Sequence, residues 1–495
     1  MNLKEINIKN YRSIEEQTFL VEEKNKSFTY TLIGTNESGK TSFLKAISLI
    51  DEGEVSFPKD FFNDREPIEI KIKYELSDYD VRKYKQDLLT KGVDSVFLKE
   101  IKIIYVEVGV TFDPNSESVR KNFERCHFEK DIFPDYVLVG GLPERKNEEK
   151  ITEDLSLQEL FFIQLPEYFY KKSHFITFWK SDPKHLIGEQ INLDNFSANP
   201  KDTSIPLFNC FKLAGFKEVS DIQFEIESIR EDSSRRQNLQ DKLGDVVTAH
   251  IAKIWPNHPI KVIFNINTMI LEFLIEDDQV KYKTKTTSQR SDGFRQFISF
   301  LLTISAEHAA NNLSRSILLI DEPETHLHPK AQEFLKEELI KITKANNRNN
   351  IVFFATHSSY MIDKDCMSRC YKVKKKDNHK TEVLKIDGDV KSYAEVNYDV
   401  FDIISSDYHN ELYGVLQETN KKSSTEDFDK YLETKGILIN KDYIYNKANG
   451  TTSTFKVTLP TYIRHQIHHP ENANNARYTI SDLEKSIKIL LKLKK

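Results

Sequence analysis

The amino-acid sequence predicts an α/β fold: a head of strands alternating with helices, a helical insertion within it, and a small, mostly helical C-terminal domain. Two observations support this prediction. Short apolar runs that end in glycine-rich or acidic loops alternate with amphipathic segments, which is the pattern of strands joined by crossover helices. The last hundred residues lack such strand–loop–helix units and end in an amphipathic segment over 480–493.

The elements follow one another in a regular order. Strand patterns cover residues 2–9, 17–33, 67–75, 101–112, 259–265, 269–275, 316–320 and 350–355, and helical patterns cover residues 39–50, 226–255, 292–311 and 329–345. Residues 371–387 form a basic hairpin pattern. From about residue 115 to 225, charged and aromatic-rich segments with scattered prolines indicate a helical insertion. We therefore divide the chain into a first lobe (1–114), the insertion (115–225), a second lobe (226–395) and a C-terminal effector or docking module (396–495).

Composition and charge exclude several classes of protein. The 495 residues carry 71 Lys and Arg against 77 Asp and Glu, a net charge of −6, which excludes a uniformly basic protein that coats nucleic acid. No apolar run approaches the roughly 20 residues that span a bilayer, and the first residues show no signal-peptide core. Four cysteines are too few for a disulfide framework. We expect no membrane partner and a cytoplasmic location.

The first chemical motif is a glycine-rich loop between an apolar strand and a helix. Residues 34–41 read GTNESGKT and fit the pattern G-x-x-x-x-G-K-[ST]. Backbone N–H groups of such a loop hold phosphate, the lysine reaches the β- and γ-phosphates, and the hydroxyl that follows binds Mg²⁺. The sequence therefore predicts ATP and Mg²⁺ as cofactors. The expected ligating residues are Gly34, Asn36, Gly39, Lys40, Thr41 and Ser42.

Two later strands end in residues that suit hydrolysis. The run SILLI is followed by Asp321 and Glu322, and the run IVFFAT is followed by His357. We expect Asp321 to hold Mg²⁺ together with Thr41, Glu322 to polarise the attacking water, and His357 to hydrogen-bond the γ-phosphate.

A fourth segment precedes the acidic strand. Ser291 suits the N-cap of the predicted helix over 292–311, and Gly293 would let phosphate approach the backbone. We interpret this helix start as a second phosphate contact.

These motifs in this order resemble the ABC-type ATPase heads of the SMC-like and OLD-like families. The stretches RSDGFRQ (290–296) and IDEPETHLHP (320–329) are similar to OLD-like ATPases of anti-phage defence systems, as is KNYRS (9–13). The resemblance covers residues 1–110 and 226–395. It implies an ATP-binding and ATP-hydrolysing switch that controls a toxic nuclease. It also implies a head-to-tail homodimer, or a higher oligomer, with ATP between the glycine-rich loop of one subunit and Ser291 and Gly293 of the other. The Q-loop glutamine of the family cannot be identified in this sequence.

The C-terminal module carries a shorter signal. Arg464 and His469 are five positions apart, similar to the R-x4-6-H motif of HEPN-type ribonucleases. In that chemistry His469 would move a proton and Arg464 would stabilise charge on the phosphorane, so the resemblance implies an RNase, with tRNA as its target. A structural or partner-docking helix is an equally good interpretation of the same residues.

Two other functions stay open. The chain could be an ATPase scaffold that restrains or activates a separate nuclease or toxin subunit through residues 396–495. A DNA-repair ATPase of the SMC type, which would act on DNA, is disfavoured because residues 115–255 show no sustained heptads.

Overall fold

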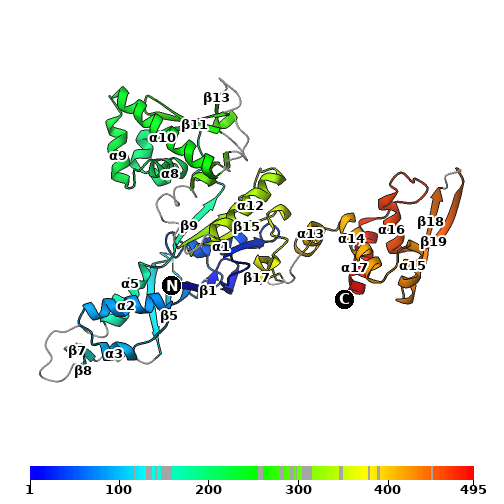
Figure 1. Cartoon of the computed structure of the whole chain (residues 1–495), viewed down its shortest axis with the longest axis horizontal. Helices are drawn as coiled ribbons and strands as arrows, with labels where there is room; N and C mark the ends of the chain where they lie inside the picture. The colour runs from blue at the N-terminus through cyan, green and yellow to red at the C-terminus, as the bar shows by residue number, and fades with distance from the viewer. Residues whose placement is uncertain are drawn as a thin grey trace. The chain divides into compact units, whose positions relative to one another are not determined.

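The computed structural model describes residues 1–115, 117–129, 136–139, 142–145, 159–254, 260–277, 284–289, 295–296, 298–303, 315–344, 349–376, 379–386, 391–446 and 450–494. The chain forms two compact units, Met1–Asp387 and Gly388–Lys495. Helix α13 (Tyr393–Phe401) opens the second unit and spans the expected boundary between residues 395 and 396. Figure 1 shows both units, with labels on many of their elements.

A six-stranded sheet forms the centre of the first unit, in the order β17-β16-β3-β15-β14-β9. The strands are β3 (Thr29–Ile33), β9 (Phe175–Lys180), β14 (Ser316–Asp321), β15 (Ile351–Thr356), β16 (Cys370–Lys375) and β17 (Thr381–Lys385). All pair in parallel except β17, which pairs antiparallel with β16. Helices α1 (Lys40–Ser48) and α12 (Pro329–Lys344) follow β3 and β14. This mostly parallel sheet with helices between its strands is the α/β architecture that the sequence predicts.

Alternate residues of the central strands enter two different hydrophobic cores. Ile317, Leu319 and Phe353 pack into one core, whereas Leu318 and Phe354 pack into the other. Successive side chains of a strand point to opposite faces, so a strand buried on both faces is apolar at most of its positions. That requirement explains the apolar runs ILLI and IVFFA.

An antiparallel sheet covers one side of α1, in the order β2-β1-β4-β5-β6. Its strands are β1 (Asn2–Tyr11), β2 (Ile14–Leu20), β4 (Ile68–Glu75), β5 (Ile103–Phe112) and β6 (Arg120–Phe128), and helices α2 (Asp78–Thr90) and α3 (Ser95–Glu100) connect β4 to β5. Helix α1 contacts β1, β9, β14 and β15, so it packs between the two sheets.

The second core extends into a third group of elements. Strands β10 (Gln190–Asn192), β11 (Ile260–Asn267), β12 (Ile270–Asp277) and β13 (Thr284–Thr286) form a sheet, and helix α10 (Ser233–Ile254) packs on β11. The predicted single helix over 226–255 is wrong at its start, because α9 (Val219–Ser228) ends within that range and α10 begins at Ser233. Of the predicted helix over 292–311, the described residues 295–296 and 298–303 are helical.

The expectation of a helical insertion over 115–225 is correct only in part. Helices α5 (Leu165–Tyr170), α6 (Leu193–Ala198), α7 (Pro200–Thr203), α8 (Ile205–Leu213) and α9 lie there, together with the π-helical turn η1 (Leu160–Gln164). However, β6 and β9 in the same stretch belong to the two large sheets, and β7 (Tyr136–Val139) pairs with β8 (Leu142–Arg145). The strand β9 pairs with β14, whose sequence lies far away, so no local pattern marks it.

The second unit is mostly helical, as predicted. Its elements are α13, α14 (Ser406–Thr419), α15 (Thr425–Thr434), β18 (Ile439–Asn446), β19 (Thr452–Thr458), α16 (Leu459–His468) and α17 (Ile480–Lys494). Its main core gathers apolar side chains from α14, α15, α16 and α17. The antiparallel hairpin β18–β19 was not expected from the sequence. Within the described residues of both units, none of the helices is long and apolar enough to cross a membrane.

Candidate nucleotide-binding site

The topology brings three predicted motifs to one edge of the central sheet. Strands β3, β15 and β14 are parallel neighbours, with Ile33 opposite Thr356 and Ala355 opposite Asp321. The carboxyl ends of parallel strands meet at the same edge of a sheet, where α/β proteins bind ligands. Gly34, His357 and Asp321 therefore follow these strands side by side.

Two glycines of the loop are required by the hairpin β16–β17 that packs behind it. A Cβ atom on Gly34 would lie 2.2 Å from the carbonyl oxygen of Val373, which is backbone and cannot give way. Gly39 has φ +109°, and a Cβ atom there would lie 2.3 Å from Thr381 Oγ1. The loop can therefore pass this close to the hairpin only with glycine at both positions.

Beyond its glycines, the loop presents both backbone and side chains to the edge of the sheet. Asn36 is exposed at its tip, and Thr41 and Ser42 lie in the first turn of α1. The free N–H groups of that first turn favour an anion.

Lys40 is buried at the centre of the site. Its Nζ donates hydrogen bonds to the carbonyl oxygens of Gly34 at 2.8 Å and Thr35 at 3.0 Å, and lies 3.5 Å from His357 Nδ1. Burial lowers the pKa of Lys40 to about 8, against the opposing influence of Glu322 and Asp321. The ammonium is bound by the loop's own carbonyls, an arrangement that an incoming anion can replace.

Thr41 and Asp321 form a direct pair across the edge of the sheet. The Thr41 hydroxyl donates to Asp321 Oδ2 at 2.8 Å, with Oδ1 at 3.1 Å. Burial raises the pKa of Asp321, and the hydrogen bond from Thr41 opposes that rise. A hydroxyl and a carboxylate are the oxygen ligands that Mg²⁺ uses beside phosphate, so the donor set fits that ion.

Glu322 and His357 form a second pair. His357 Nε2 lies 2.7 Å from Glu322 Oε1, and the hydrogen bond from His357 lowers the pKa of Glu322. The adjacent carboxyls of Asp321 and Glu322 thus have their pKa values shifted in opposite directions, upward by burial at Asp321 and downward by the His357 hydrogen bond at Glu322.

The backbone of Glu322 is held in an unusual conformation. Its φ of +50° lies in the left-handed region. The Glu322 N–H donates to Ala355 O at 3.0 Å, while the Glu322 carbonyl accepts from Gln296 Nε2 at 3.1 Å and from Thr325 Oγ1 at 2.9 Å. These bonds fix the carboxylate in the position where it meets His357.

Sequence reasoning missed two residues of the site. Glu324 is only 6% exposed, and its Oε1 accepts from Thr356 Oγ1 at 2.6 Å and from the His357 N–H at 2.9 Å. Gln296, also buried, holds the Glu322 carbonyl. Glu324 lies in the stretch IDEPETHLHP and Gln296 in RSDGFRQ. Their positions in these stretches do not predict which residues they contact.

The sequence model of a family described as an AAA ATPase domain matches residues 1–362. The chain belongs to this family. The match includes every residue of the edge just described, and family membership supports ATP binding and ATP hydrolysis.

Comparison with individual proteins adds weaker likenesses. The Old nuclease of Escherichia phage P2 is 27% identical over 166 residues, which cover 32% of this chain and only 28% of the phage protein. Among solved structures, the SMC head bound to the C-winged helix domain of ScpA has a TM-score of 0.39 at 12% identity, covering 78% of this chain and 98% of that one. RecF, of the RecFOR pathway, has a TM-score of 0.37 at 13% identity, covering 77% of this chain and 98% of that one.

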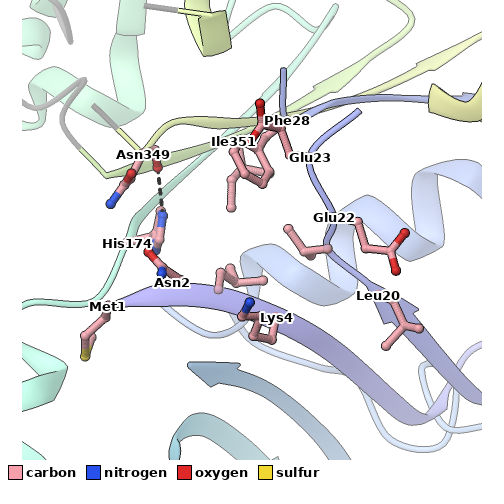
Figure 2. Close-up of a pocket in the computed structure, with 12 residues that line it drawn as sticks. Met1, Asn2, Lys4, Leu20, Glu22, Glu23, Phe28, His174, Asn349 and Ile351 are labelled. Carbon is pink, nitrogen blue, oxygen red and sulfur yellow. Dashed lines mark hydrogen bonds between the residues drawn. The ribbon is translucent and has the colours of Figure 1, made fainter. Parts of the chain in front are cut away.

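The AAA ATPase domain also contains a cavity away from the predicted site (Figure 2). It has a volume of about 710 Å³ and lies beside the first residues of β1, β9 and β15 and the end of β2, where Met1, Lys4, His174 and Ile351 are among its lining residues. His174 Nε2 lies 2.8 Å from the carbonyl oxygen of Asn349, and burial lowers the pKa of His174 to about 4. No residue of the GTNESGKT loop lines this cavity.

Four predicted residues remain: Ser291, Gly293, Arg464 and His469. Ser291 and Gly293 lie outside the described residues. Arg464 and His469 belong to the second unit: the Arg464 guanidinium lies 4.7 Å from the Tyr413 ring centre, and His469 Nδ1 lies 3.3 Å from Glu471 Oε1. Both influence the pKa of His468, which is lowered by burial and then by their charges.

Proposed function

We propose that the chain is an ATP-driven switch of a bacterial anti-phage defence system that controls a toxic nuclease activity. The observation that carries the proposal is the pairing of the site's groups. Thr41 binds Asp321, His357 binds Glu322, and Lys40 binds the loop carbonyls. Binding of ATP would exchange these internal bonds for bonds to phosphate. Ligand binding would therefore change contacts at three strand ends at once, which is the requirement for a two-state switch.

Each residue of the edge has a part in this proposal. Backbone N–H groups of Gly34, Asn36 and Gly39, with Ser42 at the helix start, would bind phosphate, and Lys40 would neutralise its charge. Thr41 and Asp321 would hold Mg²⁺, which offsets charge on the β- and γ-phosphates when bound.

Glu322 would accept the proton of the attacking water, and His357 would hold the carboxylate in place and donate to phosphate. The test is Glu322→Gln, compared with wild type for ATP affinity and steady-state hydrolysis. We expect hydrolysis to fall by about 100-fold or more with affinity retained. A Glu322→Gln variant that hydrolyses ATP at the wild-type rate would exclude this role.

We further propose that ATP joins two heads in a homodimer, with Ser291 and Gly293 of one subunit completing the site of the other. The slow Glu322→Gln variant should then dimerise on addition of ATP in light scattering after gel filtration. Replacing Gly293 with Trp in that background should abolish dimerisation without changing the melting temperature. Dimerisation that survives this substitution would exclude the shared site.

The controlled nuclease has two candidate forms. In the first, Arg464 and His469 cleave RNA, with tRNA as the target; the partial likeness to Old nuclease supports a link to nuclease chemistry in general. The test compares small RNA on gels from cells that express wild type, Arg464→Ala or His469→Ala. Intact RNA in triggered wild-type cells would exclude this form.

In the second form, the second unit docks a separate nuclease or toxin subunit. The position of Arg464 favours this form, since its guanidinium packs on the buried Tyr413 ring and His469 is bonded to Glu471 instead. Co-purification of a second polypeptide that depends on residues 396–495 would support docking. Defence by this chain alone would exclude it.

A further inference from the structure

In the second unit the hairpin β18–β19 packs beside α16 (Figure 1). Aromatic side chains of the hairpin, of α16 and of His469 at its end contact one another there. Three of these side chains are exposed: Tyr445 by 37%, Phe455 by 56% and the His469 side chain by 46%. The Tyr445 ring centre lies 6.5 Å from that of Phe455 and 6.3 Å from that of His469. We call these three residues the aromatic platform.

A buried floor supports the platform. Tyr443 and His465 are 1% and 9% exposed, and their ring centres lie 5.4 Å and 5.5 Å from that of Tyr445. Burial lowers the pKa of His465 to about 4, so this ring is neutral at pH 7 and packs as an aromatic group. The Tyr445 ring is therefore held by buried neighbours and loses little freedom when a planar ligand stacks on it.

The C-terminal segment that contains the platform differs in the sign of its net charge from the rest of the chain. Residues 436–495 contain ten Lys and Arg against four Asp and Glu, whereas residues 1–435 contain 61 against 73. A basic segment in an acidic chain is typical of contact with a polyanion. Arg464 and Lys441 lie in this segment, with Lys441 Nζ 6.0 Å from the Tyr462 ring centre.

Side-chain amides form the rim of the platform at the end of the hairpin. Asn474 Nδ2 donates to Asn446 Oδ1 at 2.7 Å, and Asn472 Nδ2 donates to the Ile444 carbonyl at 2.8 Å. Asn446 and Asn474 are both exposed, so they retain further donor and acceptor positions toward solvent. Amides of this kind can pair with the edges of nucleobases.

We infer that the aromatic platform binds single-stranded RNA, whose unpaired bases stack on Tyr445, Phe455 and His469 while nearby cations contact the phosphates. Exposed rings beside cationic and amide side chains are the combination that single-strand binding requires. The choice of RNA over DNA rests on the proposed function and on the fact that RNA presents unpaired bases in its loops. Binding itself does not depend on whether Arg464 and His469 cleave the strand.

The experiment measures binding of the full chain to a fluorescent oligouridine of about 12 nucleotides by anisotropy, with the integrity of the probe checked on a gel. The Tyr445→Ala/Phe455→Ala variant should bind about tenfold more weakly or worse, because it loses two stacking positions. Phe455→Leu, which keeps apolar volume without a ring, should also weaken binding, whereas Phe455→Tyr should bind within about twofold of wild type. Phe224→Ala is the matched control, since Phe224 in α9 is 71% exposed and lies outside this unit.

Three results would overturn the inference: unchanged affinity of the double variant, competition by duplex RNA as strong as by the single strand, or tighter binding of oligodeoxythymidine than of oligouridine. Because the substituted rings are exposed, the melting temperatures of the variants should match wild type, and Phe455→Tyr separates loss of stacking from loss of fold. RNA that binds the platform but is never cut would reject the RNase form of the proposed function alone. RNA that is cut equally by wild type and the double variant, with equal affinity, would reject the platform alone.

Discussion

Removing the Glu324 carboxylate should destabilise the first unit and slow hydrolysis together. In Glu324→Ala, the Thr356 hydroxyl and the His357 N–H lose the acceptor that they share at 2.6 Å and 2.9 Å. A buried donor without a partner costs about 1–3 kcal/mol. The Thr356 hydroxyl can rotate to another acceptor, but the N–H of His357 cannot, so we expect a loss of about 1–3 kcal/mol in the free energy of unfolding.

Glu324→Gln is the matched control for this experiment. Its amide oxygen can replace Oε1, and its NH₂ group would occupy the position of Oε2, which has no hydrogen-bond partner among the described residues. We expect a change within about 1 kcal/mol, because one polar atom stays unpaired while a buried charge is removed.

Urea unfolding gives the stabilities, and a coupled assay gives the ATPase rate. We expect Glu324→Ala to hydrolyse ATP about tenfold more slowly, since His357 would no longer be fixed opposite Glu322, and Glu324→Gln to retain most of the rate. If the alanine variant is as stable and as active as the glutamine variant, Glu324 does not position His357.

Three further predictions concern binding, backbone strain and pH. Lys40→Ala should abolish ATP binding in calorimetry without loss of fold, because the closest partners of the ammonium are carbonyls of its own loop; retained affinity would contradict the phosphate role. Gly39→Ala should lower the melting temperature more than Gly92→Ala: both glycines have positive φ, a strain of about 1–2 kcal/mol for alanine, but of these two only Gly39 has a neighbour within 4 Å. Equal losses of melting temperature in the two variants would show that the hairpin β16–β17 moves to make room for the new methyl group. Burial lowers the pKa of His409 to about 4, so between pH 6.5 and 4 the unfolded chain binds a proton that the folded chain does not. The neutral His409 therefore contributes about 3 kcal/mol to the free energy of unfolding above pH 6.5, and this contribution is lost as pH falls toward 4. In thermal melts, His409→Gln should make stability depend less on pH over this range.

The nucleotide edge could be predicted from the sequence because its signals are local. The GTNESGKT loop is read from eight adjacent residues, and Asp321 and His357 each follow directly after a buried apolar strand. Parallel pairing then places the strand ends at one edge whatever the lengths of the connections. At that edge Asp321 accepts a hydrogen bond from Thr41, and His357 contacts Glu322, a pair that the sequence did not predict.

Other features depend on contacts between distant residues, which no local pattern records. Glu324 differs from an ordinary loop carboxylate through its bonds from Thr356 and His357, which lie at the end of the next strand in the chain. Strand β9 falls within the predicted helical insertion, yet it pairs with β14 more than a hundred residues later in the chain. The hairpin β18–β19 has exposed residues on most of its length, so its alternation of apolar and polar residues is weak.

The position of β3 in the central sheet has a consequence for synthesis of the protein. Thr29 pairs opposite Val352 and Thr31 opposite Cys370, so both neighbours of β3 are made 323 and 339 positions after it. A nascent chain that ends before β15 thus contains the glycine-rich loop without the strands and the hairpin that hold it in shape. Long-range pairing of this kind forms late and slowly. The chain therefore gains its nucleotide site only near the end of translation of the first unit, and a truncated product that stops before residue 351 should emerge from the ribosome inactive.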